Sequence, residues 1–251
     1  RNTLWGSAGG MVFESETSWD AKDRFEWVEQ QSAATLESAA RKLSGDGSAV
    51  TLFNAANWKR TDPLRLKLPP GQTLAGAASE AAGDGTTFCQ IEVPESGVLG
   101  AQLKAEPAPA PKAIALPAAI ETKFYSAKID PVTGALVSIK VKPSGREMLG
   151  GPANVIVAEK YSGHGEPGDF VDPRPKRQRL ANSSDFTAIV TATEGPLAIT
   201  VEARGEFFGG GASRRVTRFF KDHPRIEFET ELNDIPDLTV VAAEFPLAAA
   251  P

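Results

Sequence analysis

The first periodic stretch of the chain has a helical pattern and lies between Trp19 and Leu43. Its apolar side chains recur at spacings of three, four and eight residues, at Phe25, Val28, Leu36, Ala40 and Leu43. Charged residues occupy the opposite face, which is typical of an amphipathic helix. Because most apolar stripes face a core, we expect this helix to pack on the following sheet or on another helix.

Beyond residue 47 the pattern becomes alternating, which predicts short strands. The apolar runs lie at Ala49–Phe53, Leu64–Leu68 and Phe88–Val93. Glycine and proline separate these runs, as they do in small antiparallel sandwiches. Residues 48–104 are therefore predicted to form a small β-sandwich.

A proline and alanine alternation follows, from Lys104 to Lys112. Such sequences favour extended polyproline geometry, and proline cannot donate hydrogen bonds inside a sheet. We interpret residues 105–118 as a Pro/Ala linker between domains.

Strand patterns dominate the rest of the chain, with almost no helix. They lie at Phe124–Ile129, Leu136–Val141, Asn154–Ala158, Ala188–Ala192, Leu197–Phe207, Arg214–Phe220, Arg225–Leu232 and Thr239–Phe245. Two turns are predicted, at Asp130–Gly134 and at Gly209–Gly211, where glycine can adopt positive φ. Residues 119–251 are thus predicted to form a second, larger β domain, and the fold class is mainly β with one N-terminal helix.

Composition narrows the function classes. The chain has 251 residues, a net charge of -5 and a pI near 5.3, so we expect neither nucleic acid nor a membrane surface as a partner. The single cysteine, Cys89, cannot form an internal disulfide, and it leaves the compartment unknown. Since the chain begins at Arg1 without methionine and stops soon after Leu247, we expect it to be part of a longer protein.

Two segments resemble glycoside hydrolase family 38, the α-mannosidase family. Residues 52–60 (LFNAANWKR) are similar to the V-F-N-x-L-x-W-x-R segment that opens the family's middle β domain. The stronger match runs from Ile120 to Glu147, and it contains Asp130, Thr133-Gly134 and Gly145-Arg146-Glu147 in the family's order. Gly195-Pro196-Leu197 also looks like that domain's pattern.

The resemblance implies an architecture and a function. Residues 119–251 would be a truncated galactose-mutarotase-like β-supersandwich, and residues 1–47 a loop and helix remnant of the helical middle region. The family's zinc, its ligands and its carboxylate nucleophile and acid/base would belong to an upstream catalytic domain of the same polypeptide. This chain would then be a non-catalytic support with no cofactor of its own. Trp5-Gly6 is similar to an H-T-W-G zinc segment, but Asn2 and Thr3 stand where its histidine would be.

The residues themselves offer little independent chemistry. The two histidines, His164 and His223, lack metal-ligand spacing, although a mutarotase-like epimerase would use a histidine pair. The basic run Pro173–Arg179 is interpreted as a solvated loop or an interdomain contact. Cys89 lies in a strand pattern and is expected to be a buried, inert thiol.

Aromatic side chains are the only candidates for binding a sugar, because an aromatic face suits the apolar face of a pyranose. The candidates are Trp58, Trp5 and Phe170. For Trp58, packing in the core or between domains is the more common role. The three aromatic residues favour an alternative function, a free-standing carbohydrate-binding module with glycans as partners. A third alternative is a structural adhesin.

Overall fold

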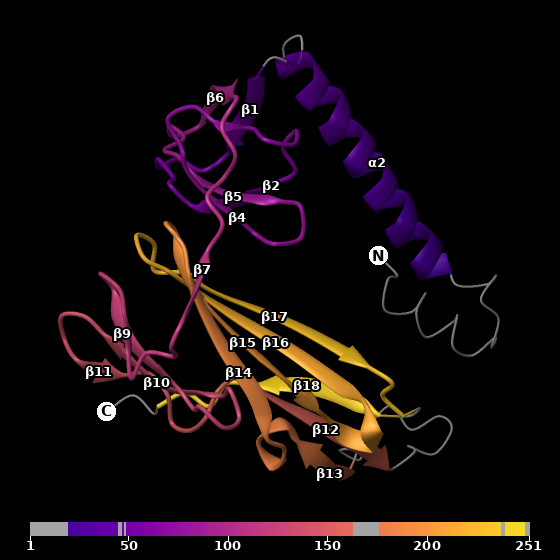
Figure 1. Cartoon of the computed structure of the whole chain (residues 1–251). Helices are drawn as coiled ribbons and strands as arrows, with labels where there is room; N and C mark the ends of the chain where they lie inside the picture. The colour runs from indigo at the N-terminus through magenta and orange to yellow at the C-terminus, as the bar shows by residue number, and fades with distance from the viewer. Residues whose placement is uncertain (1–19, 45–46, 48, 163–175, 237–238, 249–251) are drawn as a thin grey trace. The chain divides into compact units, whose positions relative to one another are not determined.

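The computed structural model describes residues 20–44, 47, 49–162, 176–236 and 239–248, and it confirms a mainly β fold with an N-terminal helix (Figure 1). The chain divides into two compact units. The first contains Arg1–Lys59 and Val93–Leu103, and the second contains Arg60–Glu92 and Lys104–Pro251. The boundaries at residues 48, 105 and 119 stay predictions.

Helix α2 spans Asp20–Leu43, in agreement with the predicted helical pattern. Its packing differs from the expectation, because every described side chain between Arg24 and Lys42 is exposed, including Trp27 at 62%. The expected contact of the apolar stripe with the following sheet is therefore wrong for these residues, and the alternative contact with another helix stays a prediction. Local interactions such as the ion pair between Glu37 and Arg41, at 2.6 Å, support the helix instead.

The rest of the first unit is built on an antiparallel pair, β1 (Ala49–Asn54) and β6 (Gly97–Lys104). Asn54, at the end of β1, is 3% exposed, and its amide nitrogen donates to the carbonyls of Trp58 at 2.8 Å and Pro94 at 2.9 Å. Its Oδ1 accepts from the backbone N–H of Ala56 at 3.0 Å. A buried asparagine that satisfies several backbone groups explains why the segment 52–60 requires an amide at this position.

The second unit holds the remaining strands, most of them in four antiparallel sheets (Figure 1). The first sheet has the order β2-β5-β4, with β2 Pro63–Leu66, β5 Thr87–Gln90 and β4 Ala78–Ala81. The second has the order β11-β10-β9-β8, with β11 Arg146–Glu147, β10 Leu136–Val141, β9 Tyr125–Ile129 and β8 Ile120–Glu121. A two-residue strand, β3 (Thr73–Leu74), also belongs to this unit.

The largest sheet contains five strands in the order β17-β16-β15-β14-β7. Their bounds are β17 Ile226–Asn233, β16 Ala212–Phe220, β15 Ala198–Glu206, β14 Ala188–Glu194 and β7 Lys112–Ile114. The fourth sheet has the order β13-β12-β18, with β13 Lys176–Asn182, β12 Val155–Ser162 and β18 Val240–Glu244. Two 3-10 turns, η2 (Ser183–Asp185) and η3 (Phe208–Gly210), complete the described elements.

The core of the second unit lies on both faces of β16. Phe219 belongs to the main apolar cluster together with Ile120, Leu136 and Val201, whereas Phe220 packs with Phe88 on the other face. Successive residues of a strand point to opposite faces, so β16 connects two layers of side chains. All residues from Arg215 to Phe220 are buried, so this part of β16 is covered on both faces.

All eight strands predicted beyond residue 119 are present, with ends shifted by a few residues. The prediction of a solvated loop at Pro173–Arg179 is wrong from Lys176 onward, because β13 begins there and pairs with β12. Residues 173–175 lie outside the described part of the chain. Charged side chains are common on edge strands, and Arg179 forms an ion pair with Glu244 of β18. The predicted linker also contributes a strand, β7, at the edge of the five-stranded sheet.

Candidate functional site

One face of the five-stranded sheet is polar, and we call it the polar face. Its side chains alternate with the apolar ones that face the main core. It is formed by Thr191 and Thr193 of β14, Thr200, Glu202 and Arg204 of β15, Arg214, Val216 and Arg218 of β16, and Glu227 and Glu229 of β17. The strand register places Thr193 opposite Thr200 and Thr200 opposite Arg218. Charges and hydroxyls from four neighbouring strands therefore lie side by side.

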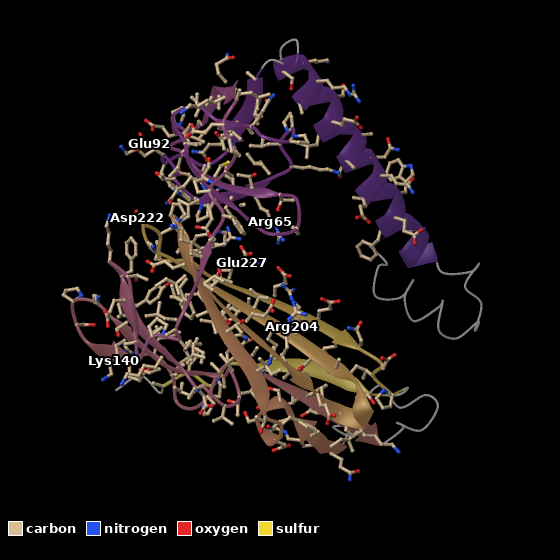
Figure 2. The ribbon with its side chains drawn as sticks, viewed as in Figure 1. Arg65, Glu92, Lys140, Arg204, Asp222 and Glu227 are labelled. Atoms are coloured by element: carbon tan, nitrogen blue, oxygen red, sulfur yellow. The ribbon has the colours of Figure 1, made fainter. Side chains whose placement is uncertain are left out.

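Ion pairs connect the charges of the polar face, and two of its charged residues, Arg204 and Glu227, are labelled in Figure 2. Arg214 donates to Glu202 at 2.7 Å and to Glu229 at 2.9 Å. Arg218, whose side chain is 6% exposed, donates to Glu227 and Glu229, both at 3.0 Å. Since each arginine bridges two carboxylates, the network fixes the side-chain geometry of three strands.

The arginines also set the charge state of the carboxylates. Burial would raise the pKa of Glu202, but the hydrogen bonds and positive charges of Arg204 and Arg214 outweigh burial and hold it below the usual value. The pKa of Glu229 is lowered in the same way, as Arg214 and Arg218 outweigh its burial. Both carboxylates are therefore ionised at neutral pH.

A cavity of about 190 Å³ lies over the polar face, within the second unit. Its floor is formed by β14, β15 and β16, and its wall by Glu80–Gly83 and Phe88. The ring of Phe88 is held by the Arg218 guanidinium, 5.4 Å from its centroid, and by Arg65 at 5.6 Å. Arg65 comes from β2 and Glu227 from β17, and both are labelled in Figure 2.

Glu80 attaches the wall of this cavity to the five-stranded sheet. It is 3% exposed, and its Oε2 accepts hydrogen bonds from the backbone N–H groups of Leu197 at 2.7 Å and Ala198 at 3.0 Å. Burial raises the pKa of Glu80, while these two amides and the charges of Lys221 and Arg218 oppose the shift. The carboxylate thus satisfies two amides at the start of β15 that would otherwise lack a partner.

The raised pKa of Glu80 predicts a pH dependence of stability. A carboxylate with a higher pKa in the folded state stabilises the fold below its unfolded pKa, about 4.3, and this contribution is lost as the pH rises through the folded value. In Glu80→Gln this dependence should disappear. Urea unfolding midpoints from about pH 4 upward should therefore favour the wild type most at the acidic end. A difference between the two proteins that grows with pH would contradict this assignment.

Glu80 and Glu202 line one cavity and have pKa values shifted in opposite directions, a pattern that also occurs in glycosidase acid and base pairs. Their contacts favour a structural role. Glu80 is engaged by two amides, and both oxygens of Glu202 accept from arginines. Both oxygens of Glu202 and Oε2 of Glu80 are thus engaged by protein donors, which leaves no acid and base pair free for catalysis.

The residues do not fit the zinc that the family 38 resemblance implies. Within the described residues there is no group of three or more His, Cys, Asp or Glu side chains that could hold a metal ion. His223, in the turn between β16 and β17, has Nε2 3.2 Å from Asp62 Oδ1, and its Nδ1 accepts from the Arg225 N–H at 3.1 Å. Both ring nitrogens are thus occupied by protein groups.

None of the helices formed by the described residues is long and apolar enough to cross a membrane.

The residues that were predicted from the sequence as site candidates have different outcomes in the structure. Trp58 belongs to the first unit and is 63% exposed, so it is not a core residue of that unit. Trp5, Phe170 and His164 lie outside the described residues. Cys89 is fully buried in β5, and burial raises its thiol pKa, as expected for an inert cysteine. The sequence interpretation missed the cavity, although the alternation of Thr200, Glu202 and Arg204 was a usable signal.

The second unit is a layered β domain, because it is built from antiparallel sheets and the largest of them has an ion-paired face. Residues 120–250 match the family model described as the glycosyl hydrolases family 38 C-terminal domain. The match spans more than half of the chain, and the chain belongs to this family. A comparison with curated proteins found no match.

Proposed function

We propose that this chain is the supporting β region of an α-mannosidase-like family 38 glycoside hydrolase, whose catalytic chemistry is performed by an upstream domain of the same polypeptide. The match of residues 120–250 to the family's C-terminal domain carries the proposal. The ion-pair network of the polar face adds support, because its carboxylates are used to hold strands together.

The supporting role follows from rigidity. A catalytic group must be held close to its productive geometry, and a small displacement lowers the rate strongly. A domain in which Glu80, Arg214 and Arg218 connect several strands through charged hydrogen bonds is suited to hold a neighbouring domain in place. Zinc would then belong to the catalytic domain, in which its ligands would lie.

The test is an aryl α-mannoside hydrolysis assay of the isolated chain, with and without added zinc. We expect no turnover above that of the buffer. A mock purification from cells that lack the gene is the control for contaminating activity. Turnover at enzyme-like rates above this control would contradict the proposal, and its loss in Glu80→Gln would assign catalysis to the cavity.

The exposed aromatic face of Trp58 favours a second candidate, a carbohydrate-binding module. Titration with mannosides, with Trp58→Ala as the comparison, separates the two. Saturable binding that Trp58→Ala removes would support the module, and a purely supporting region should show none at this residue.

A further inference from the structure

We propose that the cavity over the polar face binds one uncharged monosaccharide unit, at a site distinct from Trp58. This inference goes beyond the supporting function, because a rigid support does not require a ligand. It rests on three properties of the cavity, which are its unpartnered hydroxyls, its balanced charge and its size.

The first property is a group of three hydroxyls without protein partners. Thr191, Thr193 and Thr200 line the cavity, and Thr193 and Thr200 are only half-buried. In the described part of the chain, none of the three side chains forms a hydrogen bond with another protein group, whereas Glu202, Arg214 and Arg218 beside them are held in ion pairs. Directly opposed residues of neighbouring strands have their Cβ atoms roughly 5 Å apart. Thr193 and Thr200 therefore present two hydroxyls that a single ring can reach.

The second property is the balance of charge. Two acidic residues, Glu80 and Glu202, and two arginines, Arg214 and Arg218, line the cavity. A phosphate or carboxylate ligand would meet Glu202, which is ionised, and would compete with the carboxylates that the arginines already bind. An uncharged ligand avoids this repulsion. The hydroxyl groups of a sugar suit the remaining hydrogen-bond donors and acceptors of the cavity. They donate to carboxylate oxygens and accept from guanidinium and threonine hydrogens.

The third property is size. Pockets for drug-sized ligands usually measure about 300–1,000 Å³, and this cavity of about 190 Å³ is smaller. A cavity of this size can hold one sugar ring. The aromatic ring nearby does not serve as a stacking platform, because Phe88 is 2% exposed and lies beside two guanidinium groups. Polar contacts alone therefore define the site, and a weak affinity in the millimolar range is expected.

The test follows the backbone amides of the whole chain by heteronuclear NMR while D-mannose, D-glucose or D-galactose is added. We expect saturable shifts at Thr193, Thr200 and Val216 with at least one of these sugars. The double variant Thr193→Val/Thr200→Val should weaken that binding about tenfold or more, since each lost hydroxyl removes one hydrogen bond. Valine keeps the shape and β-propensity of threonine, so the sheet should form as before.

Thr230→Val is the matched control. Thr230 is exposed on β17 and lies opposite Arg215, on the other face of the sheet, so binding should not change. Three results would overturn the proposal: no saturable shifts at the cavity, shifts confined to Trp58, or inorganic phosphate binding there in place of the sugars. The hydrolysis assay is independent of these results, so this proposal and the supporting function succeed or fail separately.

Discussion

Gly134→Ala is expected to lower the free energy of unfolding by about 3 kcal/mol. Gly134 has a φ of 72°, and an L-residue in this left-handed region costs about 1–2 kcal/mol. A Cβ added there would also overlap the Cβ of Ala203, a buried residue of β15. Overpacking of this kind typically costs a further 1–3 kcal/mol, because neither side is a flexible side chain. Urea unfolding followed by circular dichroism measures the loss as a shift in midpoint.

Gly145→Ala separates the two contributions. Gly145 has a similar φ of 68°, but a Cβ added there would have no atom within 4 Å, so only the backbone cost of about 1–2 kcal/mol applies. Both glycines lie in turns of the same unit. Equal losses for the two variants would show that the close approach of Gly134 to Ala203 does not exist in solution.

The turn at Gly134 is a feature that the sequence predicted well, because its determinants are local. Asp130 Oδ1 accepts hydrogen bonds from the N–H groups of Val132 and Thr133, both at 2.8 Å, and Gly134 supplies the positive φ. The glycine turn at residues 209–211 and the strands beyond residue 119 were found for the same reason. What the pattern could not show is that the turn is also fixed from a distance, since the buried Arg215 donates to the carbonyl of Thr133.

Features that depend on distant residues were missed or wrong. Glu80 lies in a stretch without a marked pattern, and the amides that it binds are 117 and 118 residues away. The apolar stripe of α2 predicted a packed helix, but periodicity shows which side chains share a face and does not identify a neighbour. Trp58 was expected to pack in the core or between domains, and its exposure contradicts only the role in the core of its own unit. Strand β13 was overlooked because its charged residues resemble a solvated loop.

The contact between Gly195 and Glu80 gives a physical reason for one part of the family resemblance. Gly195 lies in the Gly195-Pro196-Leu197 segment that carries part of the resemblance, and a Cβ at this glycine would lie 2.8 Å from Oε1 of Glu80. The carboxylate of Glu80 and the missing side chain of Gly195 therefore occupy adjoining space. A glycine is needed here to let the carboxylate reach the amides of Leu197 and Ala198.

This close approach predicts a strong energetic coupling between Glu80 and Gly195. Glu80→Ala alone should cost about 2–4 kcal/mol, because two buried amides lose their acceptor and a cavity is left. Gly195→Ala alone should cost about 2 kcal/mol through overlap with the carboxylate. In the double variant the new methyl group enters the space that the carboxylate leaves, so the combined loss should fall short of the sum by about 1–2 kcal/mol.

A double-mutant cycle of urea midpoints measures this coupling, and Gly151→Ala is its control. A Cβ at Gly151 would meet only ordinary contacts at 3.8 Å from Pro246, so this variant should be near neutral and additive with Glu80→Ala. Strict additivity of Glu80→Ala and Gly195→Ala would place the carboxylate away from Gly195. The cavity wall would then lack its anchor on β15, and the sugar site over the polar face would lose the shape on which its size argument depends.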